Sequence, residues 1–125
     1  MDEAIPALEA AQEAVKKLDK AQISEMKGYP VPPDPVKEVM YAVCLLFGKK
    51  EDWQTAKNFM GDLNFLNELI GFDVEKYPEK RFLKLREQYI SKKGFNIDEV
   101  KRVSGAATSI FTWVQAIDKF QKVIY

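Results

Sequence analysis

Few side chains of this 125-residue chain have the chemistry that catalysis or metal binding needs. The sequence contains no histidine and one cysteine, Cys44, so the Ser-His and Cys-His pairs of nucleophilic catalysis lack their base. The usual ligands for zinc or copper are missing as well. The six glycines stand singly between helical patterns and form no phosphate-binding loop. We therefore expect no catalytic residue, no metal and no cofactor.

Carboxylates are the remaining candidates for catalysis. Glu25 and Asp98 could work as general acid and base if they shared a pocket, but their spacing gives this no support. Cys44 lies in the middle of an apolar stripe, so we interpret it as a small core residue rather than a reactive thiol. The chain is therefore predicted not to be an enzyme.

Electrostatic binding is a different kind of chemistry, and a set of five cations could provide it. They are Lys20, Lys27, Lys57, Lys101 and Arg102. On one shared face they would attract an acidic surface with modest, salt-dependent affinity. The alternative is that they are ordinary solvated lysines and arginines, since 30% of the residues are charged. Lysine plus arginine and aspartate plus glutamate each number 19, and this zero net charge argues against a nucleic-acid partner.

The elements that would position these cations lie between two ends with coiled-coil spacing. Apolar residues alternate in steps of three and four at Ala4, Leu8, Ala11, Val15 and Leu18, and again at Trp113, Ile117, Phe120 and Ile124. The first rhythm breaks after Leu18, which predicts a kink near Lys20. The last helix is expected to begin with a capping box of Asn96 and Glu99 and to run unbroken from 97 to 124, roughly 42 Å.

Short helices are predicted between the two ends, separated by glycines and prolines. The segment GYPVPPDP after residue 27 makes a stiff extended corner. Asp34 is expected to cap a buried helix that ends at Gly48. Three more short helices are expected to start at Asp52, near Phe65 and at Pro78. No apolar run approaches the length of a membrane span, so no membrane partner is expected.

This layout predicts an all-α fold, a small bundle of about six helices at the tip of an antiparallel two-stranded coiled coil formed by the two chain ends. Residues 1–19 would be the outgoing strand, 20–112 the globular domain, and 113–125 the returning strand, continuous with the last domain helix. Neither end carries a helix stop, so the coiled coil is expected to continue in a longer chain. A free-standing up-down bundle is the alternative.

Three segments, in this order, resemble the microtubule-binding domain at the stalk tip of dynein heavy chains. They are AVKKLDKAQISEMKGYPVPPDPVKEVMYAVCLLFG, DWQTAKNFM with the NFL that follows, and FNIDEVKRVSGAATSIFTWVQAI. The resemblance implies a monomeric, non-catalytic fragment of an ATP-driven motor whose partner is the microtubule of α/β-tubulin. Sliding of the two stalk helices, driven by a distant ATPase ring, would control its affinity. The stretch DWQTAKNFMGDLNFL resembles axonemal heavy chains, which favours the cytoskeleton of a cilium or flagellum over the general cytoplasm.

The resemblance also implies where tubulin would bind. Carried over by position, the binding residues are Lys20, Lys27, Lys57 and Arg102, with Lys101 as their neighbour. Asp98 would compete for Arg102, and Asp19 stands where some relatives carry a lysine, which would weaken the attraction.

A helical scaffold or adaptor bundle that binds a partner helix is the alternative function. It predicts that neutralising Lys57 or Arg102 changes nothing, whereas replacing an exposed apolar residue removes binding.

Overall fold

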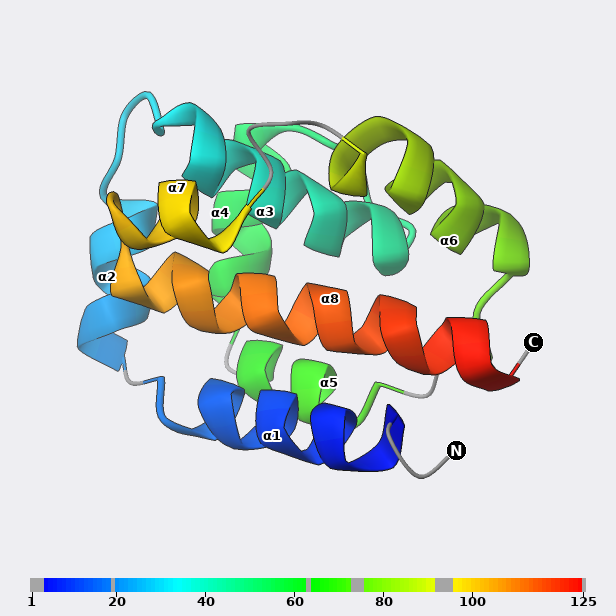
Figure 1. The fold of residues 1–125 in the computed structure, drawn as a ribbon. Coiled ribbons are helices and arrows are strands. Elements are labelled where there is room, and N and C mark those ends of the chain that lie inside the picture. Colours follow the sequence, from blue (N-terminus) through cyan, green and yellow to red (C-terminus); the bar gives the residue numbers. More distant parts are fainter. Residues whose placement is uncertain (1–3, 19, 63, 73–75, 92–95, 125) are drawn as a thin grey trace.

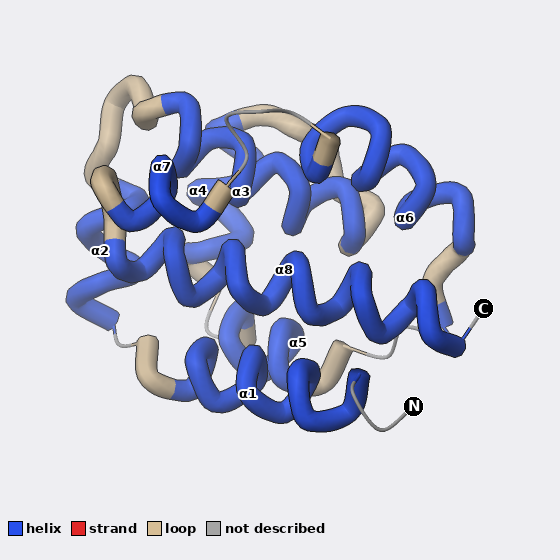
Figure 2. The backbone as a smooth tube through the Cα atoms, in the orientation of Figure 1, coloured by secondary structure: helices blue, strands red, loops and turns tan. Residues whose placement is uncertain are grey.

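The computed structural model describes residues 4–18, 20–62, 64–72, 76–91 and 96–124, and these residues form helices and loops without a strand (Figures 1 and 2). The elements are α1 (Ala4–Lys16), α2 (Lys20–Lys27), α3 (Asp34–Leu46), α4 (Trp53–Met60), α5 (Phe65–Ile70), α6 (Glu79–Leu85), the π-helical turn η2 (Arg86–Ile90), α7 (Ile97–Lys101) and α8 (Gly105–Ile124). The predicted all-α class is confirmed.

Helix α8 runs through the middle of the bundle, with α1 and α5 on one side and α3 and α6 on the other (Figure 1). Its side chains are consequently buried around most of its circumference, including Ile110, Phe111, Trp113 and Val114. The indole Nε1 of Trp113 donates a hydrogen bond of 2.9 Å to the carbonyl of Leu69 in α5. Burial on several sides is what a helix needs when its apolar residues do not form one stripe.

Helix α1 packs antiparallel along α8, so the start of α1 and the end of α8 lie at the same end of the bundle (Figure 1). Val15 and Leu18 are buried, as the heptad spacing predicted. The chain leaves the helix after Lys16 and re-enters it at Lys20, which confirms the predicted kink. Gln12 Nε2 donates a 2.8 Å hydrogen bond to the carbonyl of Ile70 and ties α1 to α5 as well.

Helix α3 begins one residue earlier than the sequence predicted. Asp34 is its first residue rather than its cap, because the carbonyl of Pro33 already accepts the first helical bond from Lys37 N at 2.9 Å. The carboxylate of Asp34 lies 3.6 Å from Lys37 Nζ instead. The predicted stop is confirmed, since Gly48 has a φ of 72°, a value that favours glycine.

The predicted helix from Asp52 is confirmed in detail. Oδ1 of Asp52 accepts a 2.7 Å hydrogen bond from the backbone N–H of Thr55. This bond lowers the pKa of the Asp52 carboxyl. Helix α4 presents Ala56, Phe59 and Met60 to the core. The helix predicted from Pro78 exists as α6 and η2, whereas its expected stop at Gly94 lies outside the described residues.

The single long helix predicted over 97–124 is wrong. The chain turns at residues 102–104, and Ser104 Oγ caps a new helix by accepting a 3.1 Å hydrogen bond from Ala107 N. A serine followed by Gly105 favours a helix start over a helix interior, which explains the break. Helix α8 therefore has 20 residues and is roughly 30 Å long.

A second set of contacts holds the carboxyl half of α8 to η2. Arg86 Nε lies 2.6 Å from Oδ1 of Asp118, a residue that is only 4% exposed, and the same guanidinium contacts the Gln121 side chain. Since Ile117 is buried too, the predicted returning strand is packed inside the bundle as far as Gln121. The division into stalk strands and globular domain stays a prediction.

Candidate functional site

The predicted cations lie on three short helices. Lys20 and Lys27 are the first and last residues of α2, Lys57 lies in α4, and Lys101 ends α7 with Arg102 directly after it. Helices α2 and α7 lie at the end of the bundle opposite the start of α1 and the end of α8 (Figure 1). Helix α4 packs against α2, behind α8 in this view. The fold thus brings these three elements to one end of the molecule.

Helix α4 is held beside the end of α2 at both of its own ends. At its start, Trp53 Nε1 donates a 2.9 Å hydrogen bond to the carbonyl of Tyr29. At its other end, a Cβ added to Gly61 would lie 3.8 Å from the Nζ of Lys27. Lys57 is half-buried and lies one turn before Gly61, whose N–H donates to the Lys57 carbonyl at 3.0 Å. Helices α2 and α4 are therefore neighbours, and the Lys27 ammonium lies near the end of the helix that carries Lys57.

Arg102 is paired with Glu99 rather than with Asp98, so the predicted Asp98 to Arg102 pair is wrong. Arg102 Nη1 lies 3.1 Å from Glu99 Oε1 and 3.3 Å from Oε2. Arg102 N still donates a helical hydrogen bond to the carbonyl of Asp98, and in a helix residues three and four positions apart are both neighbours, so Glu99 and Asp98 are both within reach of Arg102. The pair is exposed, with 73% of the arginine side chain and 43% of the glutamate side chain accessible.

The remaining predicted residues are placed only in part. Lys101 and Asp98 are exposed on α7. Lys20 begins α2, but its side chain and the whole of Asp19 lie outside the described residues. Their roles stay predictions.

The described side chains of this face carry charges that can attract an acidic partner. Nowhere among them do three histidine, cysteine, aspartate or glutamate residues gather as metal ligands. Cys44 is fully buried, and burial raises the pKa of its thiol to about 11. Within the described part of the chain, each helix is too short or too polar to span a membrane. What the face offers is exposed and half-buried positive charge.

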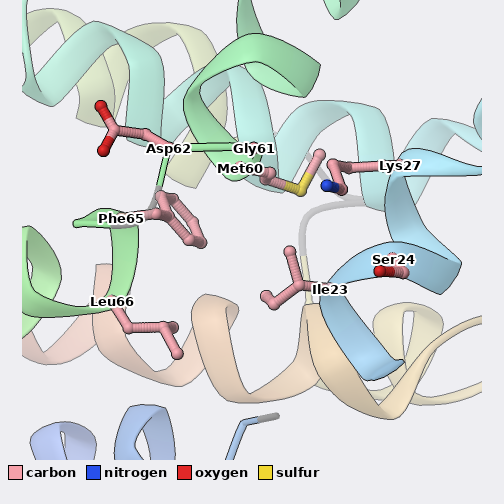
Figure 3. A pocket seen from close by; sticks show the side chains of 8 residues that line it. All are labelled: Ile23, Ser24, Lys27, Met60, Gly61, Asp62, Phe65 and Leu66. Atoms are coloured by element: carbon pink, nitrogen blue, oxygen red, sulfur yellow. The ribbon is translucent and has the colours of Figure 1, made fainter. Parts of the chain in front are cut away.

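A pocket next to Lys27 was not predicted from the sequence. It measures about 260 Å³ and lies between α2, the end of α4 and α5 (Figure 3). Its lining residues are Ile23, Ser24, Lys27, Met60, Gly61, Asp62, Phe65 and Leu66. Each helix contributes residues that look like ordinary core or surface positions, so periodicity alone contains no signal for it.

The whole chain matches a known protein family. Residues 1–125 match the family described as the microtubule-binding stalk of dynein motor. The chain belongs to this family. The resemblance found in the three sequence segments is thereby confirmed.

The dynein relatives include axonemal and cytoplasmic heavy chains. Human dynein axonemal heavy chain 2 is 39% identical over 123 residues, which cover 98% of this chain and 3% of that protein. Human dynein axonemal heavy chain 6 is 42% identical over 105 residues, covering 84% of this chain and 2% of its own length. The cytoplasmic dynein heavy chain of Dictyostelium discoideum is 32% identical over 126 residues, covering 99% and 3%. The chain thus spans a very small part of these dynein heavy chains.

The fold has a solved dynein counterpart. A structure titled "Microtubule Binding Domain of DYNEIN-C" superimposes with a TM-score of 0.84 at 30% sequence identity, covering 98% of this chain and 88% of that one. The helical architecture described above is therefore that of a dynein microtubule-binding domain.

Proposed function

We propose that this chain binds microtubules as the stalk tip of an axonemal dynein heavy chain. The observation that carries the proposal is the position of α2, α4 and α7 at the end of the bundle away from the start of α1 and the end of α8. These helices hold four of the five predicted cations, and Arg102 follows α7 directly. A chain that enters and leaves at one end presents the other end to a partner. Family membership and the 39% identity to an axonemal relative support the microtubule and the axoneme as partner and location.

The binding surface consists of Lys20, Lys27, Lys57, Lys101 and Arg102. Their attraction to the acidic surface of tubulin is electrostatic, so the affinity falls as salt rises. No bond is made or broken in this chain, and the ATPase ring of the motor lies outside it. Asp98 and Asp19 lower the affinity by adding negative charge near the surface.

In this proposal the microtubule affinity depends on the register of α1 against α8, that is, on how far one helix has slid along the other. Residues 1–19 and 113–125 act as the two stalk strands and 20–112 as the domain that they carry. Alanines at 4, 7, 10, 11 and 14 give α1 a low-relief surface on which two registers can have similar energies. A shift of α1 moves α2 with it, because α2 begins only four residues after α1 ends, at Lys20. Lys27 then approaches or leaves the filament.

Co-sedimentation with polymerised microtubules over a salt series tests the proposal. The wild-type chain is expected to pellet at low salt and to be released as salt rises. A Lys57→Glu, Arg102→Glu double variant should lose pelleting. The matched control is Lys80→Glu, Lys119→Glu, which makes the same change in net charge at two exposed residues of α6 and α8 and should pellet like the wild type.

Two results would count against the proposal. Equal loss in both double variants would mean that net charge, and not this face, matters. A wild-type chain that stays in solution at low salt calls for variants with α1 and α8 locked in alternative registers, and failure of every register overturns microtubule binding and favours the scaffold alternative.

A further inference from the structure

The pocket between α2, α4 and α5 is lined by apolar side chains together with polar groups. Ile23, Met60, Phe65 and Leu66 supply apolar walls. The Lys27 side chain points toward the pocket from α2 (Figure 3). The Asp62 carboxylate, on the far side, points away and accepts a 2.8 Å hydrogen bond from the backbone N–H of Asn64. The pocket therefore combines four apolar side chains with the positive charge of Lys27.

Gly61 lines the pocket and has no side chain to occupy it. Gly61 has φ −79° and ψ −10°, which any residue can adopt, so the backbone does not require glycine here. A Cβ at this position would lie at ordinary contact distances, 3.4 Å from the Lys57 carbonyl and 3.8 Å from the Lys27 ammonium. The missing side chain leaves space beside Lys27, at the edge of the pocket.

We propose that this pocket takes one apolar side chain of the filament that has a carboxylate beside it. This inference rests on the proposed function, because Lys27 and Lys57 then bring the filament to this edge. At about 260 Å³ the pocket falls below the size of most small-molecule sites, roughly 300–1,000 Å³, but suits one side chain. An acidic surface supplies the carboxylate for Lys27, and the neighbouring apolar group enters between Ile23 and Phe65. Burial of this apolar group adds a salt-independent contribution to the binding free energy of an otherwise electrostatic interface.

Filling the pocket from two opposite walls tests this inference. Gly61→Phe adds a ring at the mouth, with Gly61→Ala as its matched control. Ser24→Phe adds a ring from the exposed face of α2, with Ser24→Ala as its control. Each phenylalanine variant should bind microtubules about tenfold more weakly than its alanine control, the loss expected when one apolar side chain is no longer buried. Thermal unfolding of each variant checks that the bundle is intact.

The salt dependence separates this pocket from the cations. In the phenylalanine variants the slope of log affinity against log salt concentration should equal that of the wild type, because no charge has changed. In Lys27→Gln the slope should decrease.

Three results would overturn the inference. The folded phenylalanine variants could bind microtubules as tightly as the wild type, while the wild-type chain still pellets and the Lys57 and Arg102 variants still lose binding. That result would rule out a role of the pocket and leave the proposed function unaffected. A wild-type chain that fails to bind in any register would remove both. If filling the pocket instead changes the oligomeric state of the chain alone, measured by sedimentation velocity, the occupant is a second copy.

Discussion

Arg102 illustrates how a charge on the proposed surface is shared between the domain and its partner. Its guanidinium lies 3.1 Å from Glu99 in an exposed pair, and exposed pairs contribute at most about 1 kcal/mol. A filament carboxylate can therefore displace Glu99 at small cost. If Arg102 binds the filament as proposed, Glu99 is the residue that competes for it, in place of the predicted Asp98.

Removing the Glu99 charge should strengthen microtubule binding. We expect Glu99→Gln to raise the affinity about two- to fivefold, because Arg102 is released from its internal pair and one repulsive charge disappears. Asp98→Asn is the matched control, since it removes the same charge from an adjacent exposed residue that does not hold Arg102. Equal effects of the two substitutions in co-sedimentation would show that the pair has no role.

Cys44 provides a residue-scale prediction about stability and pH. Burial raises the pKa of its thiol from 9.0 to about 11. A raised pKa means that the folded chain holds the proton more strongly, so this contribution to stability is complete below pH 9 and declines between pH 9 and 11. We expect the free energy of unfolding to fall by about 2 kcal/mol more in the wild type than in Cys44→Ala between pH 8 and 10.5.

Urea unfolding at the two pH values measures this difference, and the variant corrects for lysines and tyrosines that titrate in the same range. Identical pH dependence in the two proteins would mean that the thiolate is as stable in the folded chain as in the unfolded one.

At the scale of elements, the turn between α7 and α8 decides where Lys101 and Arg102 point. An unbroken helix would continue α7 along the axis of α8. Instead Ser104 starts α8 anew, and α7 packs beside it and against α3. The cap and the glycine after it are local features, but the change of direction that they permit is stabilised by packing of Val100, which is fully buried.

Two substitutions at this turn should have opposite effects on stability. Ser104→Ala removes the bond to Ala107 N and should lower the free energy of unfolding by about 1 kcal/mol. Gly105→Ala should raise it by about 0.5–1 kcal/mol, because a Cβ there meets nothing within 4 Å and alanine favours the helix. Chemical denaturation of both variants checks the pair, and destabilisation by Gly105→Ala would contradict this account of the turn.

For the whole molecule, the returning strand is part of the core. Trp113, Val114 and Ile117 are buried, and Asp118 is tied to Arg86 across the bundle. The proposed stalk strands and the folding unit therefore overlap. Residue 112, where the proposed globular domain ends, is therefore not the end of the unit that folds cooperatively.

A truncated chain of residues 20–112 is accordingly expected not to fold. It lacks Trp113, its bond to Leu69, and the whole of α1, so the apolar surfaces of α5 and α8 would face water. Circular dichroism should show weak helicity without a cooperative thermal transition, whereas the full chain should unfold cooperatively. A cooperative transition in the truncated chain would mean that the globular domain is stable without its strands.

Local patterns in the sequence were sufficient for most of the fold. The caps at Asp52 and Asn96, the stop at Gly48 and the buried stripe around Cys44 depend on residues within about four positions of one another, so the sequence displays them directly. The three ordered segments likewise identified the family. The first residue of α3 and the turn at Ser104 were not predicted correctly. At each of these positions the neighbouring residues are compatible with more than one helix boundary.

Tertiary structure alone decided which elements meet. The sequence contains the cations of α2, α4 and α7, but packing around α8 brings these helices to one end of the bundle. Spacing in the sequence allows Arg102 to pair with either Asp98 or Glu99, and the structure shows the pair with Glu99. The pocket beside Lys27 is lined from three helices, and no spacing within one helix records it. Helix formation depends on near neighbours in the chain, whereas a surface depends on contacts between residues far apart in it.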